Sequence, residues 1–145
     1  MTEQALAGLK VIDLTHCIAG PYCTKLLADF GAEVIKVEPP GTGDPARQEG
    51  PFLRDIPNPE TSGLFLYLNT NKKSITLDLK TGTGVLLFKQ LVRQAHVVVE
   101  SFSPRVMPSL GLDYAALKDV KPDLIMTSVS NFGQTGPYRD YLLTE

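Results

Sequence analysis

The sequence has few cysteines, little net charge and no long apolar run. Its only cysteines are Cys17 and Cys23, too few for the disulfide framework of a small secreted domain. The net charge of −2 argues against the basic surface that is typical of nucleic-acid-binding domains. No apolar stretch approaches the roughly 20 residues that cross a bilayer, and residues 1–8 lack the basic and apolar regions of a signal peptide. These absences predict a soluble, cytoplasmic protein that binds neither nucleic acid nor membrane.

The chain has 145 residues, enough for one domain with a sizeable core. Hydrophobic residues make up 43% and charged residues 21%, close to the globular average. Such a composition excludes a disordered tail, a collagen and a coiled coil. We therefore expect a single folded unit.

Runs rich in β-branched residues alternate with apolar residues at helical spacing, a pattern that predicts alternating strands and helices. Because each helix leads the chain back to the start of the next strand, the strands should be parallel. The expected fold class is α/β, a Rossmann-like, doubly wound sheet. The expected strands are residues 9–14, 33–38, 74–79, 96–100 and 124–130, and the expected helices are residues 21–30, 64–68, 84–95, 104–110 and 114–120.

The helical periodicity also predicts which side chains are buried. The expected apolar stripes are Cys23, Leu26, Leu27 and Phe30 in the first helix, and Leu86, Leu87, Leu91 and Val92 in the helix at 84–95. Residues 39–62 are rich in proline and glycine and show no period, so we expect a long surface loop. Loops of this length in compact domains are usually functional or poorly ordered.

Ligands of doubly wound sheets bind beyond the carboxyl ends of the strands. Here these ends lead into residues 15–20, 39–44, 101–105 and 131–138. The glycine pairs at 41–43 and 82–84 complete neither a dinucleotide fingerprint nor a P-loop. His16, Cys17 and Cys23 lack the spacing of a zinc site, so no metal is expected. Lys72, Lys73 and Lys80 form either a solvated basic face or a contact to phosphate groups. We expect His96 to be structural.

Several segments along nearly the whole chain form a more specific pattern. They are residues 6–15, 19–21, 27–44, 69–75, 97–102, 110–112 and 128–138. In this order and spacing they resemble the family III CoA-transferases (the CaiB/BaiF family), which include formyl-CoA transferase and the carnitine CoA-transferases. The resemblance implies transfer of CoA from an acyl-CoA to a carboxylic acid acceptor, without a metal.

In this family an aspartate attacks the thioester, and the exchange passes through a mixed anhydride and an aspartyl-CoA intermediate. The matching aspartate would lie beyond Glu145, so the resemblance implies no catalytic residue within the chain. Asp13, Asp29, Asp44 and Asp140 belong to other motifs and should be structural. Residues 1–145 would form the N-terminal CoA-binding part, without the small domain and the catalytic segment and inactive alone. The resemblance also implies an interlocked homodimer at full length.

The same resemblance implies a set of residues that contact CoA. They are His16, Cys17, Ile18 and Ala19 at the thioester, Pro39 near the adenine, Leu77 and Lys80 after the Asn-Lys-Lys segment, and Ser101 and Phe102 beside the pantetheine and phosphates. Two cationic positions of the family are absent here, one of them replaced by Ser109, so we expect Arg105 to take over a phosphate contact.

Two other departures concern the substrate. Ile18 replaces a glutamine of the formyl-CoA transferases, which argues against oxalate or formate. Thr144 stands where the related α-methylacyl-CoA racemases carry a catalytic histidine, which favours a transferase. A racemase relative and a non-catalytic CoA- or nucleotide-binding module are the alternatives.

Overall fold

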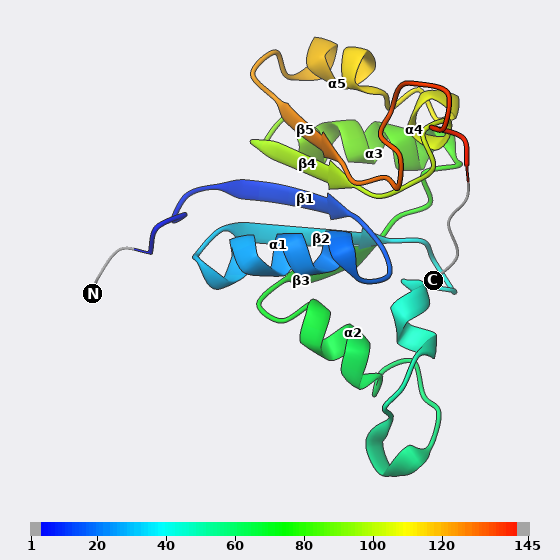
Figure 1. Cartoon of the computed structure of the whole chain (residues 1–145). Helices are drawn as coiled ribbons and strands as arrows, with labels where there is room; N and C mark the ends of the chain where they lie inside the picture. The colour runs from blue at the N-terminus through cyan, green and yellow to red at the C-terminus, as the bar shows by residue number, and fades with distance from the viewer. Residues whose placement is uncertain (1–3, 142–145) are drawn as a thin grey trace.

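A five-stranded parallel sheet is the centre of the computed structural model, which describes residues 4–141. The strand order is β3-β2-β1-β4-β5, so the chain builds outward from β1 in one direction and then from β4 in the other (Figure 1). The point of reversal lies between β1 and β4, where ligands of such sheets bind. The strands are β1 (Lys10–Leu14), β2 (Glu33–Glu38), β3 (Lys73–Thr76), β4 (Val97–Glu100) and β5 (Ile125–Ser128).

Helices cover both faces of the sheet, as the doubly wound class requires. On one face α1 packs over a cluster that includes Val11 and Val34. On the other, α3 and α5 cover a larger cluster that includes Phe88 and Leu117. The helices are α1 (Ala19–Asp29), α2 (Gly63–Leu68), α3 (Gly82–Val92), α4 (Val106–Ser109) and α5 (Tyr114–Val120), with short 3₁₀ turns η1 (Pro45–Gln48) and η2 (Leu53–Asp55).

The predicted α/β class and parallel sheet are confirmed, and the boundaries differ by a few residues. Strand β3 ends at Thr76 rather than at residue 79. Helix α3 begins two residues early because the Thr81 hydroxyl caps it, accepting from the Gly84 N–H at 3.0 Å. Asp113 caps α5 as expected, accepting from the Ala116 N–H at 2.9 Å. No helix within residues 4–141 is long and apolar enough to cross a membrane.

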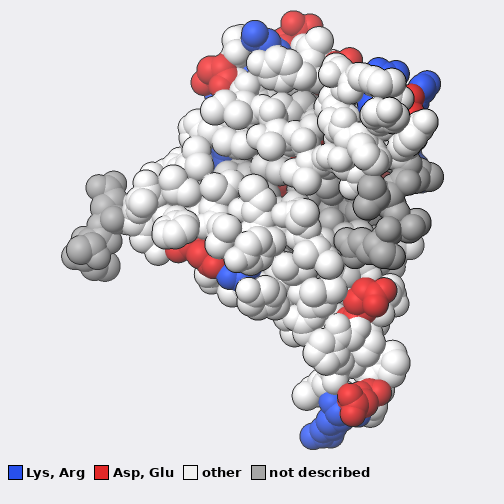
Figure 2. All heavy atoms as spheres, in the orientation of Figure 1, with Lys and Arg blue, Asp and Glu red and all other residues white. Residues whose placement is uncertain are grey.

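The apolar stripe predicted for α1 is wrong for Cys23, Leu26 and Phe30, whereas Leu27 packs against the core as expected. Cys23 is exposed and Phe30 is 59% exposed, whereas the buried positions are Gly20, Pro21, Thr24 and Ala28. Small residues face the sheet because the helix approaches β1 closely enough for a hydrogen bond from Thr24 to Asp13. Figure 2 shows the molecule in the orientation of Figure 1, with a largely uncharged surface across its middle.

The stripe predicted for α3 is half right. Val92 is fully buried and Leu91 packs against the core as expected, whereas Leu86 and Leu87 are exposed and the helix also buries Gly84 and Phe88. Apolar residues lie nearly all round this helix, so the periodicity alone does not select the face that meets the sheet.

The long loop at 39–62 lies on the surface, but several of its residues are buried. The Ser62 hydroxyl lies 2.7 Å from the Ala46 carbonyl and 2.6 Å from that of Glu49, and it accepts from the Phe65 N–H. These bonds tie the middle of the loop to the start of α2.

Candidate functional site

A cavity of about 640 Å³ opens at the carboxyl ends of β1 and β2, close to the point where the strand order reverses. It is lined mostly by the segments that follow these strands. Its walls are Leu14, Thr15, His16, Val37, Glu38, Pro39, Gly41, Thr42, Gly43, Asp44, Pro45, Gln48 and Phe102. Its position is the one expected of a ligand site in a doubly wound sheet.

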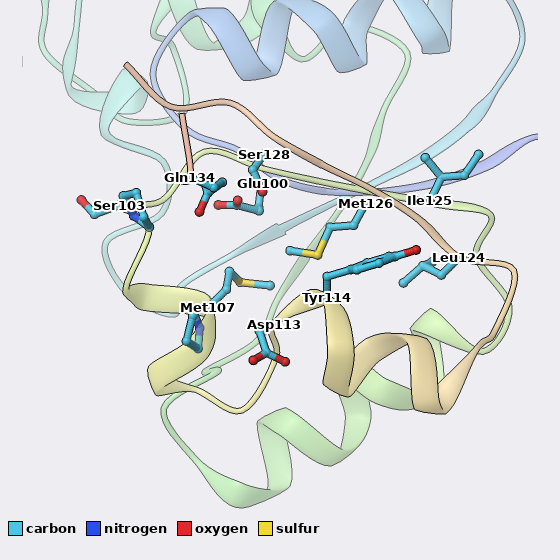
Figure 3. A pocket seen from close by; sticks show the side chains of 12 residues that line it. Glu100, Ser103, Met107, Asp113, Tyr114, Leu124, Ile125, Met126, Ser128 and Gln134 are labelled. Atoms are coloured by element: carbon cyan, nitrogen blue, oxygen red, sulfur yellow. The ribbon is translucent and has the colours of Figure 1, made fainter. Parts of the chain in front are cut away.

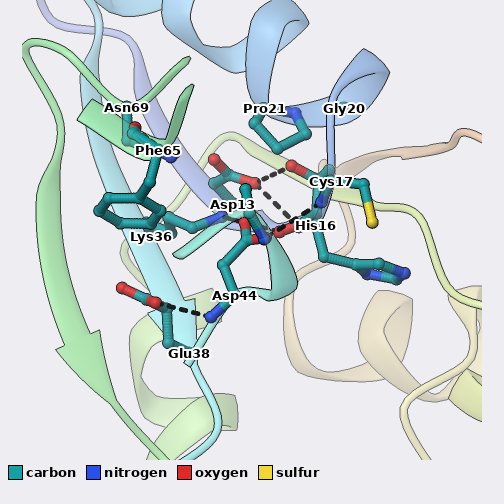
Figure 4. Close-up of polar contacts among 12 residues, drawn as sticks. Asp13, His16, Cys17, Gly20, Pro21, Lys36, Glu38, Asp44, Phe65 and Asn69 are labelled. Atoms are coloured by element: carbon teal, nitrogen blue, oxygen red, sulfur yellow. Dashed lines mark hydrogen bonds and ion pairs between the residues drawn. The ribbon is translucent and has the colours of Figure 1, made fainter. Parts of the chain in front are cut away.

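Charged side chains on the α1 face of the sheet support one side of this cavity. Side chains of a strand alternate between the two faces. On this face β2 therefore presents Val34, Lys36 and Glu38, and β1 presents Val11 and Asp13, so each strand is apolar near its amino end and charged near its carboxyl end. Figure 4 shows how these groups converge.

Asp13 is fully buried and fully engaged. Its Oδ1 accepts from the Thr15 N–H at 2.8 Å, and its Oδ2 accepts from the Thr24 hydroxyl at 2.6 Å and from Lys72 Nζ at 2.9 Å. Burial alone would raise the pKa of Asp13, but Lys36, Lys72 and the two hydroxyl groups together hold it below its usual range. The carboxylate therefore joins β1, α1 and the segment before β3.

Glu38 forms a second buried ion pair at the wall of the cavity. Arg47 Nε lies 2.7 Å from Glu38 Oε2 and Nη2 lies 2.9 Å from Oε1, a bidentate pair, and Ser74 donates to Oε1 at 2.7 Å. Burial would raise the pKa of Glu38, but these donors and the Asp44 N–H lower it from 4.5 to about 2. Arg47 also stacks on the ring of Phe65 at 3.7 Å.

This lowered pKa predicts a pH-dependent contribution to stability. A carboxyl group with a depressed pKa stabilises the fold above its unfolded pKa, and the contribution is lost as the pH falls toward the folded value. For Glu38 the window runs from pH 4.5 down to about 2. We expect Glu38→Gln to lower the free energy of unfolding by about 2 kcal/mol at pH 7. The difference from wild type should shrink below pH 4.5; a constant difference from pH 7 to pH 3.5 in urea unfolding would contradict the assignment.

The loop between β1 and α1 holds His16 beside the cavity. The Ser101 hydroxyl accepts from the His16 N–H at 3.0 Å and lies 3.2 Å from His16 Nδ1. The imidazole packs against Phe102, with ring centroids 5.5 Å apart. Burial lowers the pKa of His16, with Lys36 adding to the effect and Asp44 opposing it. The neutral imidazole is therefore favoured near pH 7.

The structure brings some of the sequence-predicted CoA residues together and not others. His16, Pro39 and Phe102 line the large cavity, and Ser101 supports His16 from behind. Cys17 and Ile18 line a neighbouring pocket of about 300 Å³ with Pro45, Ala46, Glu49, Gly50 and Leu64. Ala19 is exposed at the first position of α1.

The remaining predicted residues lie outside both pockets. Leu77 follows β3 and packs against the core, and Lys80 is exposed in the turn before α3. Arg105 is exposed and makes a bidentate pair with Asp140, at 3.0 and 2.7 Å. Thr144, the position compared with the racemases, lies outside the described residues.

The lysines at 72, 73 and 80 do not form one cluster. Lys72 is buried and pairs with Asp13, whereas Lys73 is exposed and pairs with Glu33 at 2.6 Å. The expectation of a single solvated face is therefore wrong for Lys72, which is part of the core. The expected structural role of His96 agrees with its contact, since His96 Nδ1 accepts from the Lys10 N–H at 3.0 Å.

A second large pocket lies on the other side of the switch point, between β4, β5 and the helices α4 and α5. Its volume is about 420 Å³, and its walls combine methionine and tyrosine side chains with carboxylates (Figure 3). The lining residues are Glu100, Ser103, Pro104, Met107, Pro108, Asp113, Tyr114, Leu124, Ile125, Met126, Ser128 and Gln134. Among residues 4–141 no group of three or more His, Cys, Asp or Glu side chains is placed to hold a metal ion.

Sequence reasoning missed the role of Lys36. The available signal was a lysine within the β-branched run of a central strand, where a charged residue needs a buried partner. The sequence could not identify that partner, because Asp44 comes close to Lys36 only when the chain turns back after β2.

Comparisons with known proteins identify the family of the chain. The sequence profile of CoA-transferase family III matches residues 6–143. The chain is 49% identical over 140 residues to the succinyl-CoA–D-citramalate CoA-transferase of Chloroflexus aurantiacus, covering 94% of this chain and 33% of that protein. It is 44% identical over 137 residues to the formyl-CoA:oxalate CoA-transferase of Bradyrhizobium diazoefficiens, covering 94% and 31%.

A solved structure matches equally well. The crystal structure of a CAIB/BAIF family protein from Brucella suis superposes with a TM-score of 0.86 at 40% sequence identity, covering 96% of this chain and 36% of that one. The chain therefore spans about a third of the length of the relatives it matches.

Proposed function

The chain belongs to CoA-transferase family III, and on this premise we propose that it forms the CoA-binding part of an enzyme that moves CoA from an acyl-CoA to a carboxylic acid. The observation that carries the proposal is the 640 Å³ cavity at the carboxyl ends of β1 and β2, lined by His16, Pro39 and Phe102. These residues come from three separate segments for which the resemblance to the family implies CoA contacts.

The proposed reaction exchanges acyl groups through a carboxylate. An aspartate attacks the thioester carbonyl, expelling CoA thiolate and forming a mixed anhydride. The thiolate then attacks the aspartyl carbonyl, which releases the donor acid and leaves an aspartyl-CoA thioester. The acceptor carboxylate displaces the thiolate from this thioester, and the thiolate finally attacks the acceptor's acyl carbon, which frees the aspartate. Each covalent step has a lower barrier than direct exchange.

The carboxylates at the cavity are poor candidates for this nucleophile. Glu38 is held by Arg47 and Ser74, and Asp44 lies 2.7 Å from Lys36 Nζ. Asp13 is fully buried and is bound by the Thr24 hydroxyl and by Lys72. A carboxylate in such contacts cannot reach a thioester without leaving a buried cation unpaired. We therefore propose that these carboxylates are not the nucleophile. The resemblance to the family further supports the proposal that the nucleophile is not among residues 4–141, that the chain alone is inactive, and that the full-length enzyme is a cytoplasmic interlocked homodimer.

Binding and turnover of the purified chain test this proposal separately. We expect isothermal titration calorimetry to detect CoA binding, and labelled carboxylate to show no incorporation into acyl-CoA. His16→Ala should weaken CoA binding about tenfold through loss of the packed imidazole, equivalent to about 1.4 kcal/mol. His96→Ala is the matched control because His96 lies at the opposite end of the sheet, before β4. Turnover by the chain alone would contradict the missing nucleophile, and undetectable CoA binding would contradict the proposal itself.

Arg105 provides a test of the phosphate contact. Its guanidinium is exposed and is engaged by Asp140, so it can serve a phosphate only by exchanging that carboxylate for the ligand. We expect Arg105→Ala to weaken CoA binding and to flatten its salt dependence, while Arg93→Ala, an exposed residue after α3, leaves both unchanged. Unaltered affinity and salt dependence in Arg105→Ala would remove Arg105 from the site.

A further inference from the structure

One buried ion pair holds the loop between β1 and α1 on both sides of His16. Lys36 Nζ lies 2.7 Å from Asp44 Oδ2, and both side chains are 1% exposed. Lys36 Nζ also donates to the Thr15 carbonyl at 2.8 Å. The other oxygen of Asp44, Oδ1, accepts from the Cys17 N–H at 3.1 Å. The pair therefore contacts the peptide groups that flank His16 (Figure 4).

The backbone of this loop needs such support. Cys17 has a φ of 62°, in the left-handed region, which costs a non-glycine residue on the order of 1 kcal/mol. A residue stays in this conformation only where its surroundings impose it. The Asp44 carboxylate and the Ser101 hydroxyl accept from the two consecutive N–H groups of Cys17 and His16, which fixes the direction of the chain there.

Stability alone does not account for a buried pair at this place. Taking an ammonium and a carboxylate out of water costs several kcal/mol each, and apolar side chains of similar volume are often at least as stabilising. What an apolar pair cannot supply is a donor for the Thr15 carbonyl and an acceptor for the Cys17 N–H. The contacts to the loop are thus the distinctive property of this pair.

We infer that Asp44, held by Lys36, is a positioning residue: it fixes the Cys17 N–H and so sets the His16 side chain at the wall of the cavity. The expected consequence of this positioning, tighter CoA binding, rests on the proposed function. In this role Asp44, itself part of the cavity wall, acts through the backbone of Cys17.

Two double variants separate the effect of the acceptor atom of residue 44 from the effect of the ion pair. Lys36→Met/Asp44→Asn and Lys36→Met/Asp44→Leu both remove the ion pair without leaving a lone buried ion. Only the asparagine variant retains an Oδ1 that can accept from the Cys17 N–H. Hydrogen exchange measured by NMR should show the Cys17 amide exchanging at least about tenfold faster in the leucine variant, a loss of about 1.4 kcal/mol of protection. The Ala46 N–H, which also donates to Asp44 Oδ1, should behave likewise.

Leu117→Ala controls for general destabilisation. Leu117 is the fully buried residue of α5, on the face of the sheet opposite α1, and its truncation lowers stability without touching the loop. In Leu117→Ala the Cys17 amide should exchange its hydrogen more slowly than in Lys36→Met/Asp44→Leu. If the leucine and asparagine variants protect Cys17 equally, Asp44 does not position the loop and the inference is overturned.

The CoA affinity of the same variants tests the consequence. We expect the dissociation constant to be about tenfold higher for the leucine variant than for the asparagine variant. Equal CoA affinities combined with unequal exchange would overturn the link between the loop and CoA binding. If the wild-type chain itself does not bind CoA, the proposed function fails, and the exchange comparison still decides whether Asp44 positions the loop.

Discussion

Lys72→Met should lower the free energy of unfolding by about 3–5 kcal/mol, a large fraction of the stability of an ordinary domain. Lys72 Nζ donates to Asp13 Oδ2, to the Pro21 carbonyl and to Asn69 Oδ1, each within 2.9 Å. Without the ammonium, Asp13 remains ionised in a fully buried position, where Lys36 and the hydroxyl groups of Thr15 and Thr24 only partly stabilise it, and the loss of its ion-pair partner is the main cost. Urea unfolding at pH 7 measures the loss.

The neighbouring lysine is the matched control. Lys73 pairs with Glu33, and both side chains are exposed, so Lys73→Met should cost less than about 1 kcal/mol. If Lys72→Met does not fold, Lys72→Met/Asp13→Asn removes the orphan carboxylate and should recover much of the stability. Equal losses for Lys72→Met and Lys73→Met, or no recovery in the double variant, would contradict this account of the buried pair.

The loss in Lys72→Met should also depend on pH. Burial lowers the pKa of Lys72 and the Asp13 carboxylate opposes that effect, while the pKa of Asp13 is held below its usual range. Asp13 therefore stabilises the wild type above its unfolded pKa and loses this effect as the pH falls through its folded value. In the variant, protonated Asp13 needs no cation. The difference in the free energy of unfolding between wild type and variant should therefore become smaller as the pH falls. A difference that grows in acid would be inconsistent with an ionised Asp13.

Gly84→Ala should destabilise the fold by about 3 kcal/mol, although alanine normally favours a helix over glycine. A Cβ at Gly84 would lie 1.8 Å from the Asp78 carbonyl oxygen and 2.7 Å from its carbon. The obstacle is backbone, so the turn after β3 and the start of α3 would have to separate. Thermal unfolding followed by circular dichroism should show the loss as a lower Tm.

Gly82, two residues earlier in the same helix, gives the control. A Cβ there meets nothing within 4 Å, and its φ is not in the left-handed region. Gly82→Ala should therefore leave stability unchanged or raise it by up to about 1 kcal/mol, because alanine restricts the unfolded chain. A large loss at Gly82, or none at Gly84, would show that close approach to Asp78 does not govern this helix start.

The sequence predicted the elements well and their buried faces poorly. The β-branched runs placed all five strands within a few residues, and Asp113 marked the start of α5. The stripes of α1 and α3 were only partly correct, because both helices carry apolar residues on more than one face. Burial then depends on which face lies against the segments that follow the strands: a Cβ at Gly20 would meet the Thr15 side chain, and one at Gly84 the Asp78 backbone.

The sequence by itself determined the parallel α/β sheet, because periodicity and helix caps are local properties. It also determined the family, because the order and spacing of the motifs can be read from the sequence without knowing which residues are in contact. Only the tertiary structure decided which charges pair. Lys36 meets Asp44 and Lys72 meets Asp13 across 8 and 59 residues of chain. Such pairs form only when separate strands and loops bring their ends together, and the energy of a buried charge depends on the partner that the fold supplies.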